Sequence, residues 1–128
     1  MNILLDTNFI VTCVKEKIDF NSQINDIIDE KINWIIPEDI LNEIKDLSQR
    51  KGLKILDKRS AEVALDLIGI IDKKKIKLVG NNPNIDVKIA EYLRRNKDVV
   101  LATLDKGLKK RVKNKILTIR SRKKLEII

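Results

Sequence analysis

The first ten residues of the chain, MNILLDTNFI, constrain its fold more than any other stretch. Residues 3–5 form a short apolar run without polar alternation, which is typical of a strand buried on both faces of a sheet. Asp6 follows this run directly, so it would stand at the carboxyl end of a central strand, where open α/β sheets place their ligands. Thr7 and Asn8 can cap the helix that follows. The simpler interpretation is that Asp6 only caps this helix. The other acids of the chain decide between this interpretation and a ligand site.

Strand-like and helix-like segments alternate through the rest of the chain. Apolar runs predict further strands at residues 33–36, 76–79, 98–104, 116–119 and 125–128. Apolar residues at helical spacing predict helices at residues 9–17, 37–50, 58–72, 84–96 and 105–115. Another helix is expected to begin after a cap at Asn21 or Ser22. Strands that alternate with helices favour a parallel sheet with helices on both faces. We therefore predict an α/β fold in a single domain, residues 1–128.

Composition fits a globular protein of the cytoplasm. Hydrophobic residues make up 43% of the chain and charged residues 36%, a balance typical of a folded domain rather than a disordered one. No apolar run approaches the roughly 20 residues that a membrane span needs, and no basic segment precedes the first apolar run as in a signal peptide. The single cysteine, Cys13, cannot form an internal disulfide, which suits a reducing compartment. We expect no membrane partner.

The absence of histidine limits the chemistry that the chain can perform. It excludes Ser-His-Asp and Cys-His catalysis, and it excludes zinc held by histidine. Catalysis must therefore come from carboxylates, lysines, hydroxyls or a metal ion held by oxygen atoms.

Positive charge is concentrated in the second part of the chain, whose net charge overall is +8. Residues 1–50 contain 10 acids and 5 bases, whereas residues 51–128 contain 9 acids and 22 bases. The segment from Lys106 to Lys124 has 10 Lys or Arg residues and no acid. Such asymmetry predicts a polyanionic partner, nucleic acid first and a membrane surface second. A solvated basic helix face is the simpler alternative.

Two acids lie close to the apolar faces of their predicted helices. Glu43 falls within about 60° of the apolar stripe of helix 37–50 at 100° per residue. Asp86 shares a face with the apolar residues of helix 84–96, one turn from its start. A carboxylate that points toward an apolar interior is costly unless a positive group pairs with it, and neither helix offers an obvious cation on the same face.

These two acids can meet two others at one edge of the predicted sheet. Asp6 and Asp105 each follow a buried strand, and the carboxyl ends of parallel strands share an edge. Glu43 and Asp86 lie early in their helices, near the same edge. Four carboxylates stay together if some are protonated or if a hard divalent cation such as Mg²⁺ or Mn²⁺ neutralises them. We favour the cation, because it can also bridge to a phosphate and activate a water molecule.

The order of these motifs resembles that of PIN-domain ribonucleases along essentially the whole chain. Residues 3–10 match the family's apolar strand followed by Asp, Thr or Ser, and Asn or Ser. Residues 37–44 match its Pro-x-x-aliphatic-x-x-Glu-aliphatic segment. Residues 86–90 match its acid before an aliphatic–Ala helix, and residues 103–108 match its Thr-x-Asp-x-x-Leu motif.

The resemblance implies a three-layer α/β/α fold around a parallel sheet of about five strands in the order 3-2-1-4-5, and it suggests a homodimer. It implies RNA hydrolysis that depends on one or two Mg²⁺ or Mn²⁺ ions. The catalytic metal ligands would be Asp6, Glu43, Asp86 and Asp105, and the supporting polar groups would be Thr7, Asn8 and Thr103. The chain departs from the family at Leu104, where a polar residue is common, and at Lys106-Gly107, where a further acid often stands as a fifth ligand.

The basic ending resembles the ribosomal RNA processing branch of the family, so an rRNA-processing endoribonuclease is our first hypothesis. The residues expected to hold the RNA backbone are Lys106, Lys109, Lys110, Arg111, Lys113, Arg120, Arg122 and Lys123. A VapC-type toxin ribonuclease, with an antitoxin as partner, is the nearest alternative. The others are a non-catalytic RNA-binding assembly factor and, more distantly, a receiver or phosphatase, which would need a second acid that Asp6-Thr7-Asn8 lacks.

Overall fold

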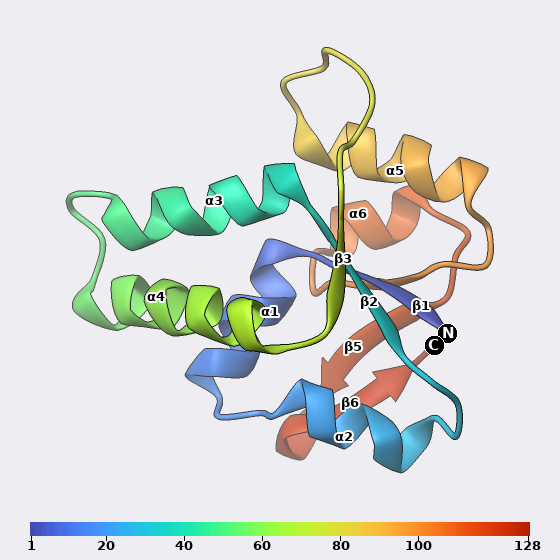
Figure 1. The fold of residues 1–128 in the computed structure, drawn as a ribbon, viewed down its shortest axis with the longest axis horizontal. Helices are drawn as coiled ribbons and strands as arrows, with labels where there is room; N and C mark the ends of the chain where they lie inside the picture. Colours follow the sequence, from blue (N-terminus) through green and yellow to red (C-terminus); the bar gives the residue numbers. More distant parts are fainter.

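The computed structural model, which describes residues 1–128 except for the side chain of Arg122, contains one six-stranded sheet (Figure 1). The strands are β1 (Asn2–Leu5), β2 (Asn33–Pro37), β3 (Lys73–Ile76), β4 (Val100–Ala102), β5 (Ile116–Arg120) and β6 (Lys124–Ile127). Their order is β3-β2-β1-β4-β5-β6; the first five are parallel, and β6 is antiparallel to β5. The predicted α/β class and the order 3-2-1-4-5 are confirmed, and β6 extends the sheet at one edge.

Helices cover both faces of this sheet, as the alternating pattern predicts. They are α1 (Thr7–Lys15), α2 (Phe20–Ile27), α3 (Glu38–Gln49), α4 (Ile55–Ile70), α5 (Ile85–Arg95) and α6 (Lys106–Arg111), with a 3₁₀ turn at Ser121–Lys123. Figure 1 shows α1, α3 and α4 on one side of the sheet and α5 and α6 on the other, with α2 near β6. None of the helices in the described chain is long and apolar enough to cross a bilayer.

The core forms around β1, because this strand is hydrogen-bonded on both sides and covered on both faces. Its residues Ile3, Leu4 and Leu5 have no exposed surface. Next to it, Phe20 of α2 packs edge-to-face between Phe9 and Trp34, with ring centroids 5.7 and 5.1 Å away. Trp34 is therefore a buried residue and not an exposed platform for base stacking.

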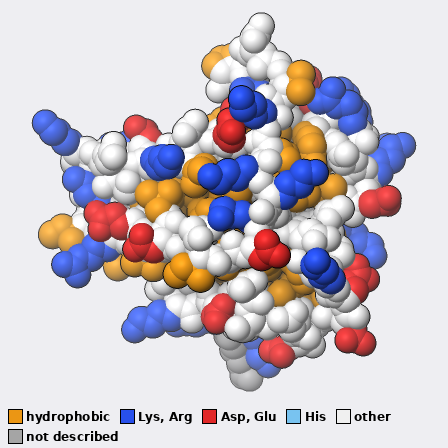
Figure 2. All heavy atoms as spheres, in the orientation of Figure 1, with side chains coloured by type: hydrophobic (Ala, Val, Ile, Leu, Met, Phe, Trp, Pro, Cys, Tyr) orange, Lys and Arg blue, Asp and Glu red, His pale blue; other side chains and the backbone are white. Residues whose placement is uncertain are grey.

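The third strand lies three residues earlier than predicted. The apolar residues 76–79 predict the strand, but the structure pairs residues 73–76 with β2. The register explains the shift: Ile76 pairs with Pro37, the last residue of β2, so residues 77–79 have no strand beside them. β3 is an edge strand rich in lysine, which discourages pairing with other chains. Figure 2 shows Lys and Arg side chains over this part of the surface.

Two helix caps also differ from the prediction. Asp6 itself caps α1, where Thr7 and Asn8 were expected to do so, and its side chain accepts a hydrogen bond from the backbone N–H of Thr7. Asp19 caps α2 by accepting from the N–H of Ser22. Asn21 is not the cap because the helix begins before it, at Phe20; its Oδ1 instead accepts a hydrogen bond of 2.8 Å from the Nε1–H of Trp34. Asn84 does cap α5, as predicted.

The bond between Trp34 and Asn21 predicts a stability effect. Asn21→Ala should lower the free energy of unfolding by about 1–3 kcal/mol, because the buried indole N–H loses its acceptor. Asn42→Ala is the control: Asn42 is an exposed asparagine of another helix, α3, and its substitution should change the free energy by less than about 0.5 kcal/mol. Urea denaturation of both variants measures the difference, and equal effects would contradict the assignment.

Candidate active site

The candidate site lies where the chain reverses direction across the sheet. From β1 the chain builds outward to β2 and β3, and it then returns to place β4 on the other side of β1. Open α/β sheets bind ligands at such a switch point, in the crevice at the carboxyl ends of the strands. Asp6 follows β1, and Asp105 follows β4 after two further residues. The backbone N–H of Asp6 donates to the carbonyl oxygen of Ala102 at 3.0 Å, which joins the two strand ends.

A pocket of about 410 Å³ opens at this point, and all four predicted acids line it. Its lining residues are Asp6, Thr7, Asn8, Val11, Thr12, Lys15, Glu43, Leu47, Asp86 and Asp105. The acids come from four separate segments: the ends of β1 and β4 and the early turns of α3 and α5. The structure therefore brings together carboxylates that are far apart in the sequence. Lys15, a basic residue among the lining groups, forms an ion pair with Asp57 of α4.

Asp6 is buried and held from two sides. Its Oδ1 accepts from the N–H of Thr7 at 2.9 Å, and its Oδ2 accepts from the hydroxyl of Thr103 at 2.7 Å. Thr103 has no exposed surface, and its hydroxyl oxygen accepts from the N–H of Asp105 at 3.1 Å. The Thr103 hydroxyl thus connects the two acids that follow β1 and β4. Each Asp6 oxygen keeps a further lone pair for a ligand.

Asn8 forms hydrogen bonds within this site, whereas the hydroxyl of Thr7 has no partner among the described residues. The Oδ1 of Asn8 accepts from the N–H of Leu104 at 3.1 Å, so Asn8 fastens the turn between β4 and α6 to α1. Its 3.4 Å contact with the Thr103 hydroxyl is weaker, because the single hydroxyl proton is directed to Asp6. The Oγ1 of Thr7 is buried and has no hydrogen-bond partner among the described residues.

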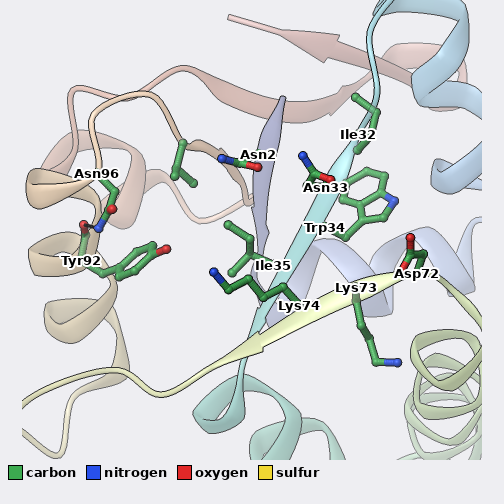
Figure 3. Close-up of a pocket in the computed structure, with 11 residues that line it drawn as sticks. Asn2, Ile32, Asn33, Trp34, Ile35, Asp72, Lys73, Lys74, Tyr92 and Asn96 are labelled. Carbon is green, nitrogen blue, oxygen red and sulfur yellow. Dashed lines mark hydrogen bonds between the residues drawn. The ribbon is translucent and has the colours of Figure 1, made fainter.

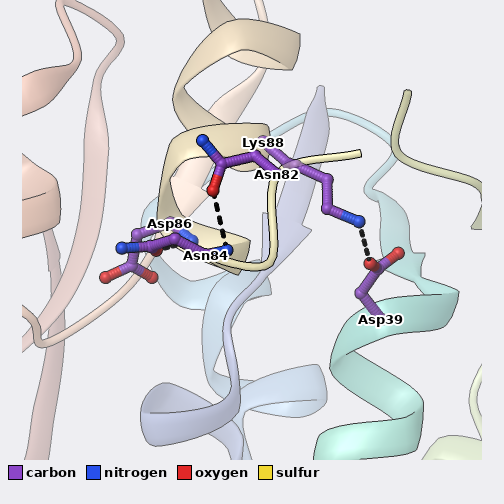
Figure 4. A network of polar contacts seen from close by, with 5 residues as sticks. All are labelled: Asp39, Asn82, Asn84, Asp86 and Lys88. Carbon is purple, nitrogen blue, oxygen red and sulfur yellow. Dashed lines mark hydrogen bonds and ion pairs between the residues drawn. The ribbon is translucent and has the colours of Figure 1, made fainter. Parts of the chain in front are cut away.

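Backbone and side-chain bonds also position Asp86 and Asp105. The N–H of Asp86 donates to Oδ1 of Asn84, and the N–H of Asn84 donates to Oδ1 of Asn82, both at 2.9 Å (Figure 4). Asp105 caps α6: its Oδ1 accepts from the N–H groups of Gly107 and Leu108 at 2.8 and 3.2 Å. These caps use one oxygen of Asp105 and leave Oδ2 available for a ligand.

An ion pair that we did not predict joins the helices that carry Glu43 and Asp86. The Nζ of Lys88 in α5 lies 2.8 Å from Oδ2 of Asp39 in α3, and both side chains are partly buried (Figure 4). Asp39 lies one turn before Glu43, and Lys88 lies two residues after Asp86. The pair therefore fixes the spacing of two walls of the pocket. The only sequence signal was a lysine near the start of α5.

The electrostatics of the pocket are those of crowded, poorly solvated carboxylates. Burial raises the pKa of Asp6 to about 6, and the charges of Asp86 and Glu43 add to the rise, whereas the bonds from Thr103 and Thr7 oppose it. Burial also raises the pKa of Asp86, helped by Asp105 and Glu43, while the guanidinium of Arg111 opposes the rise. None of the four acids forms an ion pair with a described lysine or arginine side chain.

These residues fit a hard divalent cation in their chemistry. Four oxygen ligands without paired cations, two raised pKa values and the unpartnered Thr7 hydroxyl all mark a site where positive charge and polar ligands would be stabilising. As the side chains lie here, no three of the described Asp, Glu and Cys groups are arranged to hold one ion. Binding therefore requires side-chain rotation, which the half-buried Glu43 and Asp86 permit.

The predicted RNA-binding residues divide into two groups. Arg111 and Lys113 line a groove beside α5, and Lys106 and Lys110 are exposed on α6. The others have protein partners: Lys109 donates to Thr118, Arg120 lies 3.9 Å from Glu126, and Lys123 lies 3.5 Å from Glu16. The side chain of Arg122 lies outside the described residues.

A separate hollow lies at the opposite end of the sheet (Figure 3). It has a volume of about 380 Å³ and is bordered by the first residues of three strands, including Asn2 and Lys73. Tyr92 points from α5 toward Ile35 and Lys74 across this hollow. Because it opens at the amino ends of the strands, it is distant from the four acids and does not contribute to their site.

Burial of the Asp6 carboxylate, with a smaller contribution from the neighbouring acids, predicts that Asp6 lowers the stability of the metal-free protein. The folded pKa of about 6 exceeds the unfolded value of 3.8, so the folded state binds the proton more tightly and stability falls as pH rises between these values. In EDTA at pH 7.5, Asp6→Asn should raise the free energy of unfolding by about 1–3 kcal/mol, less than the full linkage value because the amide replaces only one of two acceptors.

Thermal or urea unfolding at pH 7.5 and pH 4 tests this effect. The gain from Asp6→Asn should shrink toward pH 4, where wild-type Asp6 is protonated in the folded state. Asp98→Asn, at an exposed turn, is the control and should show no such dependence. A less stable Asp6→Asn protein at pH 7.5 would contradict the account. Asp86→Asn should be stabilised in the same direction, because the pKa of Asp86 is also raised.

Comparison with known proteins agrees with this fold. The sequence model described as a PIN like domain matches residues 3–124. Ribonuclease VapC4 of Methanocaldococcus jannaschii is 32% identical over 129 residues, which cover 98% of this chain and 95% of that protein.

Two solved structures share the fold at lower sequence identity. The PIN domain endonuclease Utp24 has a TM-score of 0.79 and 23% identity, with 98% of this chain and 90% of that chain covered. VapBC2 from Rickettsia felis, solved bound to a DNA fragment from its promoter, has a TM-score of 0.61 and 17% identity, with 92% and 98% covered. The family match spans nearly the whole chain, and we conclude that this protein belongs to the PIN-like domain family.

Proposed function

We propose that this protein is an endoribonuclease that hydrolyses RNA phosphodiester bonds with the help of Mg²⁺ or Mn²⁺. One observation carries the proposal: carboxylates from four distant segments line a single pocket at the switch point of the sheet, without a lysine or arginine partner among the described side chains. A purely structural cluster of acids would be expected to include paired cations. The similarity to Ribonuclease VapC4 supports RNA as the substrate.

Asp6, Glu43, Asp86 and Asp105 would hold the ion. A divalent ion in such a pocket supplies a more acidic water and neutralises charge on the phosphate. The protein's own part is positioning: Thr103 holds Asp6 and Asp105 in register, Asn8 fastens the turn between them, and the Lys88–Asp39 pair sets the distance between α3 and α5. Thr7, Asn8 and Thr103 are supporting groups in this proposal.

The raised pKa of Asp6 fits a role as a ligand of the ion. Burial and the neighbouring acids raise this pKa to about 6 in the metal-free protein, and a divalent cation beside the carboxylate would favour its ionised form. Each of its oxygens retains an unused lone pair for such an ion, and the bond from Thr103 keeps the carboxylate oriented.

A VapC-type toxin ribonuclease is the second candidate, and the comparisons favour it at one point. The 32% identity with Ribonuclease VapC4 extends over 95% of that protein, whereas the 23% likeness to Utp24 concerns the fold alone. The basic ending supports an rRNA-processing role. Induced expression in a bacterial host tests the toxin role. Growth arrest that is lost in Asp6→Asn indicates a toxin, and normal growth counts against a toxin.

Cleavage assays test the nuclease itself. Purified protein should cut single-stranded RNA with Mg²⁺ or Mn²⁺ and stop in EDTA. Asp6→Asn or Asp105→Asn should lower the rate more than about 100-fold, because each removes an anionic ligand. Both variants should still bind RNA, and Asp98→Asn should cut at the wild-type rate. If wild type and Asp6→Asn both bind several RNAs but neither cuts them, the protein is an RNA-binding factor without catalytic activity.

A further inference from the structure

A second groove runs along α5, directly beside the carboxylate pocket. It has a volume of about 650 Å³ and lies between α5 and the segment that follows α6. Its lining residues are Val87, Ala90, Glu91, Leu93, Arg94, Lys97, Arg111, Val112, Lys113 and Asn114. The two hollows adjoin, because Asp86 lines the pocket and Val87 lines the groove. Arg111, which lines the groove, is the last residue of α6, and this short helix begins directly after Asp105 of the pocket.

The groove has basic walls and an apolar floor. Arg94 and Lys97 stand on the α5 side, Arg111 and Lys113 stand on the opposite side, and all four are exposed. None of them forms an ion pair with another described side chain, although Glu91 lies in the same groove. The part of the floor that a ligand can reach comes from the half-buried Val87 and Ala90 of α5 and from Val112 on the opposite side, because Leu93 is fully buried.

Hydrogen bonds hold the two walls together without a ligand. The Nδ2 of Asn114 donates to the carbonyl oxygens of Val99 at 2.8 Å and Asn96 at 3.0 Å. The side chain of Asn96 in turn donates to the carbonyl oxygen of Tyr92 at 2.8 Å. The segment after α6 is therefore tied to the end of α5, and the groove is preformed. Preformed sites bind with a smaller loss of conformational entropy.

This geometry matches a single-stranded nucleic acid better than a duplex. Basic side chains along both walls can neutralise backbone phosphates, and the apolar floor offers a dry surface to unpaired bases. A duplex hides its bases and could use only the walls. No aromatic side chain is found among the described lining residues, so base stacking and strong sequence preference are not expected.

We propose that this groove holds the single-stranded RNA segment next to the phosphate that the carboxylate pocket cleaves, an inference that rests on the proposed ribonuclease function. The path runs from Lys97 and Lys113, at the far end, past Arg94 to Arg111 and the four acids. Arg94 and Lys97 lie outside the basic segment 106–124, and the fold alone places them beside it. Lys109, Arg120 and Lys123, which have protein partners, are not part of this path.

Binding of a fluorescein-labelled ten-nucleotide oligouridine, measured by anisotropy in EDTA so that no cleavage occurs, tests the groove. Arg94→Glu/Lys97→Glu should weaken binding at least about tenfold and reduce the slope of log K against log salt by about 1.4, since two phosphate contacts are lost. Arg94→Lys/Lys97→Arg should bind within about twofold of wild type. Lys51→Glu/Lys75→Glu makes the same charge change at exposed sites outside the groove. This variant should bind oligouridine within about threefold of wild type, with the wild-type salt slope. Circular dichroism confirms that each variant is folded.

Several results would overturn the proposal: no binding of oligouridine by wild type, equal loss in the two charge-reversed variants, or tighter binding of the matching duplex. The failure of the nuclease proposal is distinct from these. Wild type that binds oligouridine through the groove but never cuts RNA refutes the catalytic function only. An active enzyme whose KM for single-stranded RNA is unchanged by Arg94→Glu/Lys97→Glu refutes the groove only.

Discussion

The concentration of negative charge at the carboxyl ends of β1 and β4 is the constraint on which the rest of the structure depends. Asp6 is buried beside three other acids, and the protein supplies hydrogen bonds there rather than cations. Such an arrangement costs stability unless something positive occupies the pocket. Hydrogen bonds reduce this cost: the Thr103 hydroxyl donates to Asp6, and Asp6 and Asp105 accept from backbone N–H groups as caps of α1 and α6. We interpret the site as one built for a cation and a phosphate.

The described basic residues nearest the pocket lie around it and do not pair with its four acids. Lys88 and Lys15 are neutralised by Asp39 and Asp57, so they brace the helices around the pocket without filling it. Arg111 stands at the junction with the α5 groove. In the function proposed above, this division would provide an acidic centre for an ion and a basic approach for a polyanion. A substrate phosphate would be attracted over a distance and held next to the acids without a lysine competing for their oxygens.

Local patterns in the sequence predicted most of the strands and helices and singled out the four acids that line the pocket, because each of these features depends on neighbouring residues. The order of the strands was predicted from the resemblance to PIN domains instead. An apolar run before Asp6 or near Asp105, and helical periodicity around Glu43 and Asp86, need no knowledge of distant residues. Features that depend on register or long-range packing were missed. The start of β3 depends on where β2 ends, the Lys88–Asp39 pair joins residues 49 positions apart, and the groove needs α5 to lie against residues 111–114. The cap of α2 was also missed, because the chain enters this helix at Phe20, two residues before the predicted start.

Location of a bound metal ion tests the central claim most directly. Crystals grown with Mn²⁺ and measured at the manganese absorption edge should show an anomalous peak in the pocket, coordinated by Asp6 and by at least two of Glu43, Asp86 and Asp105 after rotation of their side chains. The same peak should be absent from crystals of Asp6→Asn. A wild-type structure at saturating Mn²⁺ with no peak among the four carboxylates, or with the ion bound only elsewhere, would contradict the account.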